Sequence, residues 1–255
     1  MERELPDFEL NGVVFTVDVD TAQIAMKEDA SSFEWLFDLP EEKNRYILHF
    51  NNKTGRIAKP WENGDGVVIF HVPQLTALDP EGMAMKYKTP LAIIKKMNDF
   101  DVLVNKEVLK ERLRGKLPTI EILGQVYTVD IEGGILKPLH RLDLPNITTA
   151  YLERFEELHA YEIPYNLERR CMVDATPQEV LRRPADYKIV RVPLLEELDR
   201  IGFNKKRGFD LYKRIKLNPP KAHHHSEVIH YRQMTAIANS LLIKLKKRKG
   251  KRKGL

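Results

Sequence analysis

This 255-residue chain matches itself in three blocks that occur twice in the same order. The matched pairs are 5–24 with 117–136, 44–51 with 159–166, and 71–112 with 191–232. The last pair aligns without a gap and contains 13 identities in 42 positions, too many for chance. Because a repeated sequence specifies a repeated fold, we predict two tandem homologous repeats, 1–116 and 117–236, followed by a tail at 237–255.

The residue pattern within each repeat predicts an α+β fold with short antiparallel strands. Phe8–Leu10 and Val13–Val19 are predicted as strands joined by Asn11-Gly12, because this dipeptide supplies the positive φ angles of a tight hairpin. Arg45–Phe50 runs into a turn-forming cluster and predicts a second hairpin. Val67–Val72 is a β-branched run that ends at a proline and is predicted as a further strand.

Two or three short helices are predicted in each repeat. Asp79 precedes Pro80, an arrangement typical of a capped helix start, and Asp199 repeats the cap without the proline. Further helices are predicted over Leu91–Met97 and Lys106–Arg114. The residues between them, Leu103–Asn105, are predicted as a short strand and a cap.

The repeated pattern resembles a family of duplicated bacterial proteins, uncharacterised in activity, that carry the same Leu-Pro-Thr-Ile-Glu-Ile and Val-Asp motifs. Here the motifs are Leu117–Asp130 and, in the first repeat, Leu78–Gly82. The resemblance covers most of the chain outside the tail. It implies a duplicated architecture and no particular activity.

The strongest charge bias lies in the tail. The formal net charge is +5, yet the body alone is slightly acidic, which disfavours a broad phosphate-binding surface on it. Clustered cations bind nucleic acid without fixed geometry, so we predict sequence-independent contact with DNA or RNA through the tail. An amphipathic helix is predicted from Ile229 to Leu245 before it, and a membrane surface, an acidic protein or plain solvation are the alternatives. The predicted nucleic-acid-binding residues are Lys244, Lys246, Lys247, Arg248, Lys249, Lys251, Arg252 and Lys253.

A run of histidines in the second repeat is a candidate metal site. Imidazoles next to a carboxylate are ligands for zinc or another divalent metal, with Asp130 or Glu132 as additional ligands. The alternative is that the run is an exposed edge of the fold, since it aligns with Leu103–Asn105. The candidate metal ligands are His223, His224, His225, Glu227 and His230.

Other candidate groups favour structural roles. The acid pair Asp18/Asp20, repeated as Asp130/Glu132, is expected to bond turn amides rather than a cation. Cys171 is expected to be a structural thiol in a strand, and as the single cysteine it forms no intrachain disulfide. The phosphate-loop, dinucleotide and serine-elbow motifs are absent, so nucleotide chemistry has no motif support.

The sequence therefore predicts a non-enzymatic, cytoplasmic binding or adaptor protein without a cofactor. No apolar run is long enough to span a bilayer and no secretory signal is apparent. Its expected partner is DNA or RNA, or a protein. One alternative is a metal-dependent enzyme that uses the His223–His225 region, and another is a structural subunit of a larger assembly.

Overall fold

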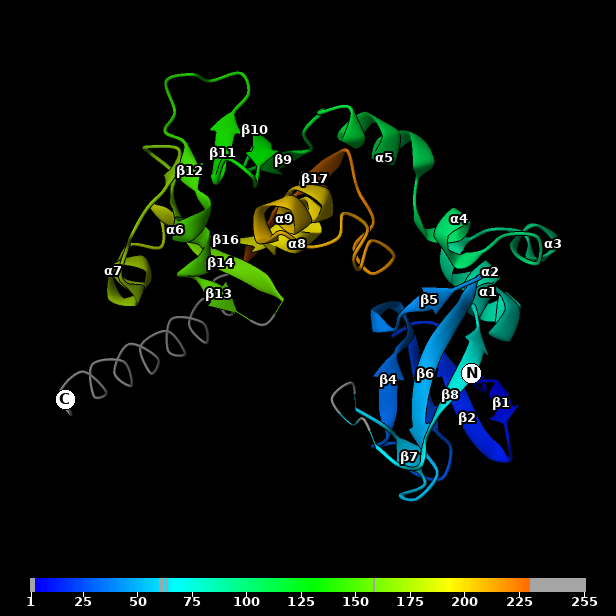
Figure 1. Ribbon diagram of the computed structural model, residues 1–255. Coiled ribbons are helices and arrows are strands. Elements are labelled where there is room, and N and C mark those ends of the chain that lie inside the picture. Colours follow the sequence, from blue (N-terminus) through cyan, green and yellow to red (C-terminus); the bar gives the residue numbers. More distant parts are fainter. Residues whose placement is uncertain (1–2, 60–61, 63, 158, 230–255) are drawn as a thin grey trace. The chain divides into compact units, whose positions relative to one another are not determined.

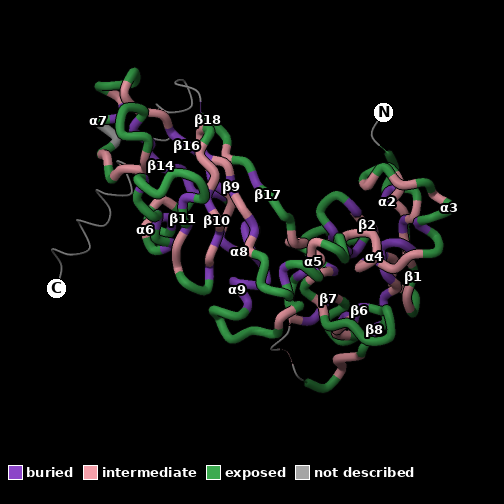
Figure 2. The backbone as a smooth tube through the Cα atoms, turned by 90° about the horizontal axis from the view of Figure 1, so that it is seen from above, coloured by how far each residue is buried: buried purple, intermediate pink, exposed green. Residues whose placement is uncertain are grey.

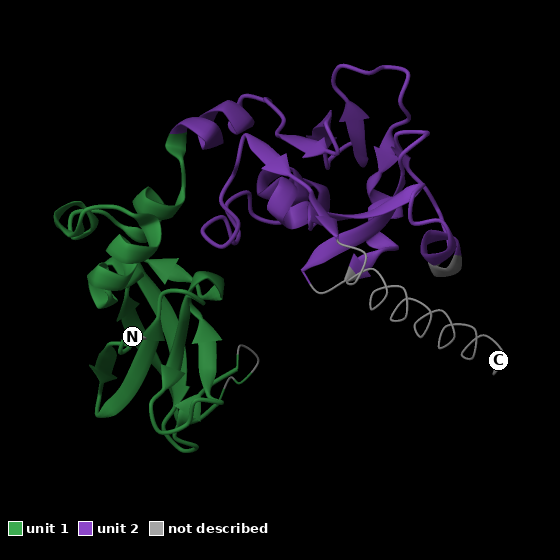
Figure 3. Cartoon of the chain, turned by 180° about the vertical axis from the view of Figure 1, so that it is seen from behind, with its two compact units in different colours: residues 1–106 green, residues 107–255 purple. Residues whose placement is uncertain are grey.

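The computed structural model describes residues 3–59, 62, 64–157 and 159–229. The chain divides into two compact units, unit 1 (residues 1–106) and unit 2 (residues 107–255), shown in Figure 3. The division falls at the first residue of helix α5 (Lys106–Leu113), whereas the predicted boundary at 116/117 follows this helix. The predicted tail, with all eight of its candidate cations, lies outside the described residues.

Unit 1 combines two small antiparallel sheets with short helices (Figure 1). One sheet has the strand order β1-β2-β3-β4, and in the other β6 pairs with β5, β7 and β8. Its elements are β1 (Asp7–Leu10), β2 (Val13–Asp18), β3 (Gln23–Met26), β4 (Phe33–Trp35), η1 (Leu36–Asp38), β5 (Glu41–Glu42), β6 (Arg45–Asn51), β7 (Arg56–Ile57), β8 (Val67–Pro73), α1 (Leu75–Leu78), α2 (Pro80–Tyr87), α3 (Leu91–Ile94) and α4 (Asp99–Leu103).

Unit 2 has a similar order of elements as far as α9, with helix α7 added before β16, and it has strands β17 and β18 after α9 where unit 1 has helices α3 and α4 after α2. Its first sheet has the order β12-β11-β10-β9-β17, and its second β13-β14-β16-β18 with β15 on β14. After α5 its elements are β9 (Thr119–Ile122), β10 (Gln125–Asp130), β11 (Ile135–Pro138), β12 (Ile147–Thr148), α6 (Thr149–Glu153), β13 (Glu156–Glu157), β14 (Ala160–Asn166), β15 (Cys171–Met172), α7 (Pro177–Arg182), β16 (Tyr187–Pro193), α8 (Leu195–Leu198), α9 (Arg200–Arg207), β17 (His223–His225) and β18 (Glu227–Ile229).

The first hairpin of each unit has the geometry that the sequence predicts. Asn11 and Gly12 both have positive φ, and so do Leu123 and Gly124 at the matching turn. Phe8 stands opposite Phe15 in unit 1, and Ile120 stands opposite Tyr127 in unit 2, each displaced by 112 residues. In β2 and β10 half-buried and buried residues alternate, so one face of each of these strands packs into its unit's core; Figure 2 colours the chain by burial.

The long central strand pair also corresponds between the units. β6 and β8 pair antiparallel with Tyr46 opposite Val72, and β14 and β16 pair with Tyr161 opposite Val192. The predicted strands at Arg45–Phe50 and Val67–Val72 are thereby confirmed. Both long strands extend to the proline that ends the run.

Three details of the predicted elements are wrong. Leu103 ends helix α4 instead of forming a strand, because Asn98 caps this helix by accepting from the Asp101 N–H at 2.8 Å. The predicted helix over Leu91–Met97 stops at Ile94. Ile229, the expected first apolar residue of an amphipathic helix, is the buried last residue of strand β18.

Each unit buries its own apolar cluster. In unit 1 the rings of Phe50 and Phe70 stack at 5.2 Å, and Phe15 meets both edge-on at 6.3 and 6.4 Å. In unit 2 Tyr127, Tyr165 and Val190 occupy the aligned positions and are buried as well. The described residues contain no helix long and apolar enough to cross a membrane.

A buried aspartate at the start of a helix binds an arginine in both units, and this arginine is buried in unit 2 (Arg112) and exposed in unit 1 (Arg3). The Arg112 guanidinium donates to both carboxylate oxygens of Asp199 at 2.9–3.1 Å, and Asp199 also accepts from the Gly202 N–H at 3.1 Å. Arg3, Asp79 and Gly82 make the same contacts in unit 1. A Cβ at Gly202 would collide with the Asp199 carboxylate, and a Cβ at Gly82 with Asp79, so glycine is required at both positions.

We predict that Asp199→Asn destabilises unit 2 by about 3 kcal/mol, because it removes the buried counter-charge of the Arg112 guanidinium and leaves only the partly exposed Glu132. Both tryptophans, Trp35 and Trp61, belong to unit 1. In denaturant titrations of Asp199→Asn, the unfolding transition measured by far-UV circular dichroism should therefore move to lower denaturant concentration. The transition measured by tryptophan fluorescence should stay in place. The matched variant Asp79→Asn should move the fluorescence transition instead. An equal effect of Asp199→Asn on both signals would contradict this assignment.

Candidate functional site

The histidine run forms an added strand on the first sheet of unit 2. β17 pairs with β9 in parallel, so that His223 lies opposite Thr119 and His225 opposite Glu121. The Thr119 N–H donates to the Ala222 carbonyl at 3.1 Å, and the Ser226 N–H donates to the Glu121 carbonyl at 2.9 Å. Side chains alternate along a strand, which places His223 and His225 on the exposed face and His224 on the buried one.

Glu121, His223 and His225 gather on that exposed face. Among the residues that the structure describes, they are the one group of three or more His, Cys, Asp or Glu side chains close enough to share a metal ion, with one ligand atom from each lying within 4.8 Å of the others. His225 Nδ1 lies 3.8 Å from Glu121 Oε2. The two imidazole rings meet edge-to-face with centroids 4.5 Å apart.

The other predicted metal ligands do not join this cluster. Glu227 extends toward Arg191 at 3.7 Å, and His230 lies outside the described residues. Asp130 caps a turn by accepting from the Gly133 N–H at 2.6 Å, while Glu132 accepts from Arg112 and Lys205. The carboxylate that does join the cluster is Glu121, which precedes the histidine run by about a hundred residues. Sequence reasoning missed it because only the parallel pairing of β9 with β17 brings it close.

His224 serves the core and is not a ligand. It is 6% exposed and lies opposite buried Ile120 in the ladder. Burial, together with the nearby Lys221 charge, lowers the pKa of His224 to about 4. The aligned position in unit 1 is Val104, which is also buried. His224, one of the predicted metal ligands, therefore does not join Glu121, His223 and His225, because strand alternation turns it inward.

We predict that His224 makes unit 2 sensitive to acid. Its pKa falls from 6.5 in the unfolded chain to about 4 in the fold, so the unfolded chain takes up the proton first. The contribution of the neutral His224 ring to the free energy of unfolding is complete above about pH 6.5. It declines by up to about 3 kcal/mol as the pH falls toward 4. His224→Val should flatten this decline in pH-dependent denaturation, whereas exposed His140→Val should not. Equal slopes for wild type and His224→Val would contradict the prediction.

The remaining predicted structural groups behave as expected. Asp18 accepts from the Asp20 N–H at 2.8 Å and from the Thr21 hydroxyl at 2.6 Å, which is a turn and not a cation site. Cys171 is a free, half-buried thiol that opens strand β15.

A second candidate surface lies on helix α9 and the segment after it. Residues 200–221 contain eight Lys and Arg and one acidic residue, whereas the rest of 117–236 contains 10 basic and 16 acidic residues. The slightly acidic net charge of the body conceals this segment, because it is an average over the whole repeat. We call its exposed part the basic surface, defined by Lys205, Lys206, Arg207, Phe209, Tyr212, Lys213 and Arg214.

The buried side chain of Asn204 holds the segment after α9, which carries part of the basic surface, in place. Its side-chain amide donates to the Leu211 carbonyl at 3.0 Å and to the Lys213 carbonyl at 2.9 Å, which ties the following segment back to α9. Gly208 ends the helix with a positive φ of 67°, and the Phe209 N–H donates to the Asn204 carbonyl at 2.9 Å. These bonds tie the backbone of the segment that carries Tyr212 and Lys213 to the helix that carries the cations of the last turn.

Two aromatic rings are exposed within the basic surface. Phe209 is 45% exposed and Tyr212 is 47% exposed, although large apolar rings normally pack inward. The Lys213 ammonium lies 4.1 Å from the centre of the Phe209 ring, so a cation and a ring face share one location. Sequence reasoning missed this surface, although the spacing of Phe209 and Tyr212 between cations was a readable signal.

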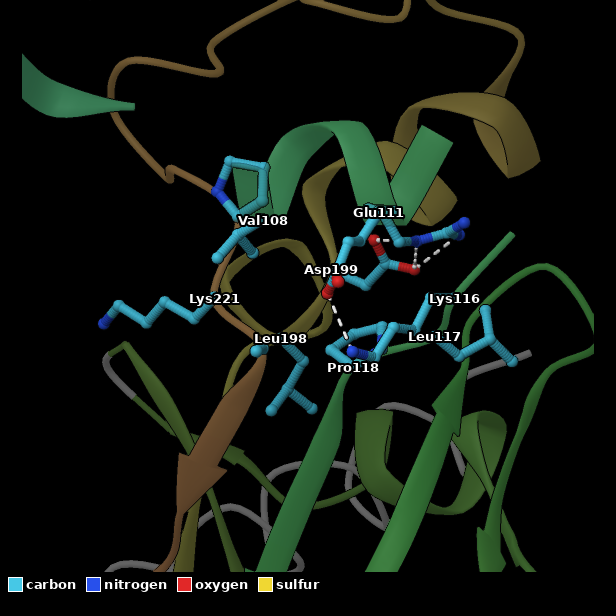
Figure 4. Close-up of a pocket in the computed structure, with 11 residues that line it drawn as sticks. Val108, Glu111, Lys116, Leu117, Pro118, Leu198, Asp199 and Lys221 are labelled. Atoms are coloured by element: carbon cyan, nitrogen blue, oxygen red, sulfur yellow. Dashed lines mark hydrogen bonds and ion pairs between the residues drawn. The ribbon is translucent and has the colours of Figure 1, made fainter. Parts of the chain in front are cut away.

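A hollow beneath α5 does not form a substrate site. Figure 4 shows Leu198, Asp199 and Lys221 beside it, with Pro118 and Glu111 on the other elements that line it. The free space is about 20 Å³, which is room for about one water molecule. The Arg112–Asp199 ion pair forms its inner wall, so the hollow belongs to the structural network.

Comparison of the chain with protein-family models, with curated proteins and with solved structures gives no match.

Proposed function

We propose that this chain is a nucleic-acid-binding protein, whose contact surface is the basic surface of unit 2 together with the basic tail. The observation that carries the proposal is the concentration of cations and exposed rings on α9 and the segment after it. Lys and Arg side chains neutralise phosphates and release counterions, which supplies most of the affinity of sequence-independent binding.

Exposed aromatic rings between cations favour a single strand as the ligand. Bases stack on aromatic faces only where they are not already stacked in a duplex. Phe209 and Tyr212 offer such faces, and Lys213 places a positive charge beside the first of them. The tail, which lacks aromatic residues, then adds phosphate contacts without geometric demands.

We further infer that the two units descend from one duplicated unit and that only the second carries the nucleic-acid contact. The equal registers of the hairpins and of the long strand pairs support the duplication. At the positions aligned with residues 209–214, unit 1 has Thr89, Pro90, Leu91, Ala92, Ile93 and Ile94. These residues supply neither cations nor aromatic rings, which supports a function restricted to unit 2.

We predict that Lys206→Gln/Lys213→Gln weakens binding of a fluorescent single strand by about tenfold in low salt. The slope of log K against log salt should become shallower by about 1.4, since each lost phosphate contact on a single strand contributes about 0.7. Fluorescence anisotropy at several salt concentrations measures both quantities in the full chain.

The matched control for this charge removal is Lys95→Gln/Lys96→Gln on unit 1, where both lysines are exposed. It should leave the affinity and the slope unchanged. Lys246→Gln/Lys247→Gln/Lys249→Gln measures the contribution of the tail separately. Equal losses from the unit 1 pair and the unit 2 pair would show a net-charge effect and overturn the proposed surface.

We predict that Phe209→Leu and Tyr212→Leu each weaken single-strand binding by about fivefold or more, because a stacked base contributes about 1–3 kcal/mol. Binding of the corresponding duplex should change little. The exposed Trp35 of unit 1 gives the control variant Trp35→Leu, which should leave both affinities intact. Unchanged single-strand binding by both unit 2 variants would contradict stacking.

A further inference from the structure

We propose that Glu121, His223 and His225 form a binding site for a borderline divalent cation, with zinc as the preferred ion. The site is independent of the nucleic-acid surface proposed above. Two imidazoles and one carboxylate are a ligand set that zinc takes in proteins. The three side chains project from neighbouring strands of one sheet on the same face.

A hydroxyl fixes the orientation of the first imidazole. Thr119 Oγ1 lies 2.7 Å from His223 Nδ1 and 3.3 Å from the Ala222 carbonyl oxygen. The carbonyl can only accept, so the His223 tautomer that carries its proton on Nδ1 can donate to the Thr119 hydroxyl while that hydroxyl donates to Ala222. That tautomer leaves His223 Nε2 unprotonated and available to a metal. A partner that holds the second ring nitrogen is typical of metal-ligating histidines.

The gap between His225 and Glu121 suits a shared cation better than a direct bond. The distance of 3.8 Å between His225 Nδ1 and Glu121 Oε2 is too long for a hydrogen bond. Two ligands of a tetrahedral zinc stand roughly 3.3 Å apart, given metal bonds of about 2.0–2.1 Å. A side-chain movement that shortens this distance by about half an ångström therefore lets both atoms bind a single zinc ion.

The backbone beneath the site is held by the sheet. β17 is locked to β9 by ladder bonds, and inward-facing His224 packs in the core between the two outward-facing histidines. Unit 1 has Glu9 at the position aligned with Glu121, but β1 is an edge strand and the aligned Leu103–Asn105 supplies no imidazole. Three protein ligands leave one tetrahedral position open to water or to another donor.

The test is a competition titration of the metal-stripped full chain with Zn²⁺ against a chromophoric chelator. We expect one zinc per chain, with binding weakened more than tenfold in His223→Gln, His225→Gln and Glu121→Gln. Thr119→Val removes only the partner of His223 Nδ1 and should weaken binding by about tenfold. Nitrogen NMR of the imidazoles should report zinc at Nε2 of His223.

Matched controls separate a built site from general surface affinity. His140→Gln and Glu227→Gln alter an exposed histidine and a nearby carboxylate outside the cluster and should leave zinc binding unchanged. Circular dichroism of every variant establishes that it folds. The proposal is overturned if the wild type binds no stoichiometric zinc, if His140→Gln weakens binding as much as His223→Gln, or if Glu227→Gln and not Glu121→Gln lowers the affinity.

Discussion

The buried pair of Arg112 and Asp199 is the contact on which the organisation of unit 2 depends. It joins helix α5 to the start of α9, and the same carboxylate caps α9 through the Gly202 N–H. A charge buried this deeply is tolerated because both carboxylate oxygens accept from Arg112, one of them also accepts from the Gly202 N–H, and the arginine gains Glu132 as a second partner. Unit 1 repeats this arrangement with Arg3 and Asp79.

Both proposed sites are built outward from this contact. Asp199 determines where α9 begins, and therefore where its cationic last turn and the Asn204-anchored segment present Phe209 and Tyr212. Leu198 precedes Asp199, and its backbone lies near the ring of His224. His224 is the inward-facing residue of β17, the strand that carries the histidine cluster. The histidine cluster of unit 2 thus lies on strand β17, where unit 1 has helix α4, and the basic surface lies on α9, whose capped start resembles that of α2 in unit 1.

Local chemistry made much of the fold readable. Asn11-Gly12 forms the tight hairpin, Pro73 and Pro193 end the long strands, and Asp79 caps the helix that Pro80 begins, since each residue type is suited to one backbone geometry. The candidate sites were readable only in part. The sequence pointed to His223 and His225 but not to Glu121. The basic surface was missed because the net charge was averaged over the whole repeat. The ligands of a metal site must lie close together in space. The spacing of residues in the sequence predicts such closeness only within one helix or strand.

The amino-acid sequence by itself determined the strands, the turns, the capped helices and the correspondence between two stretches of chain, because these depend on neighbouring residues and on alternation. The tertiary structure alone decided that β17 adds to β9 in parallel, that His224 turns inward while its neighbours meet Glu121, and that Asn204 holds two exposed rings among cations. These outcomes depend on pairing between segments separated by up to about a hundred residues, where the free energy of packing the core selects one register among many.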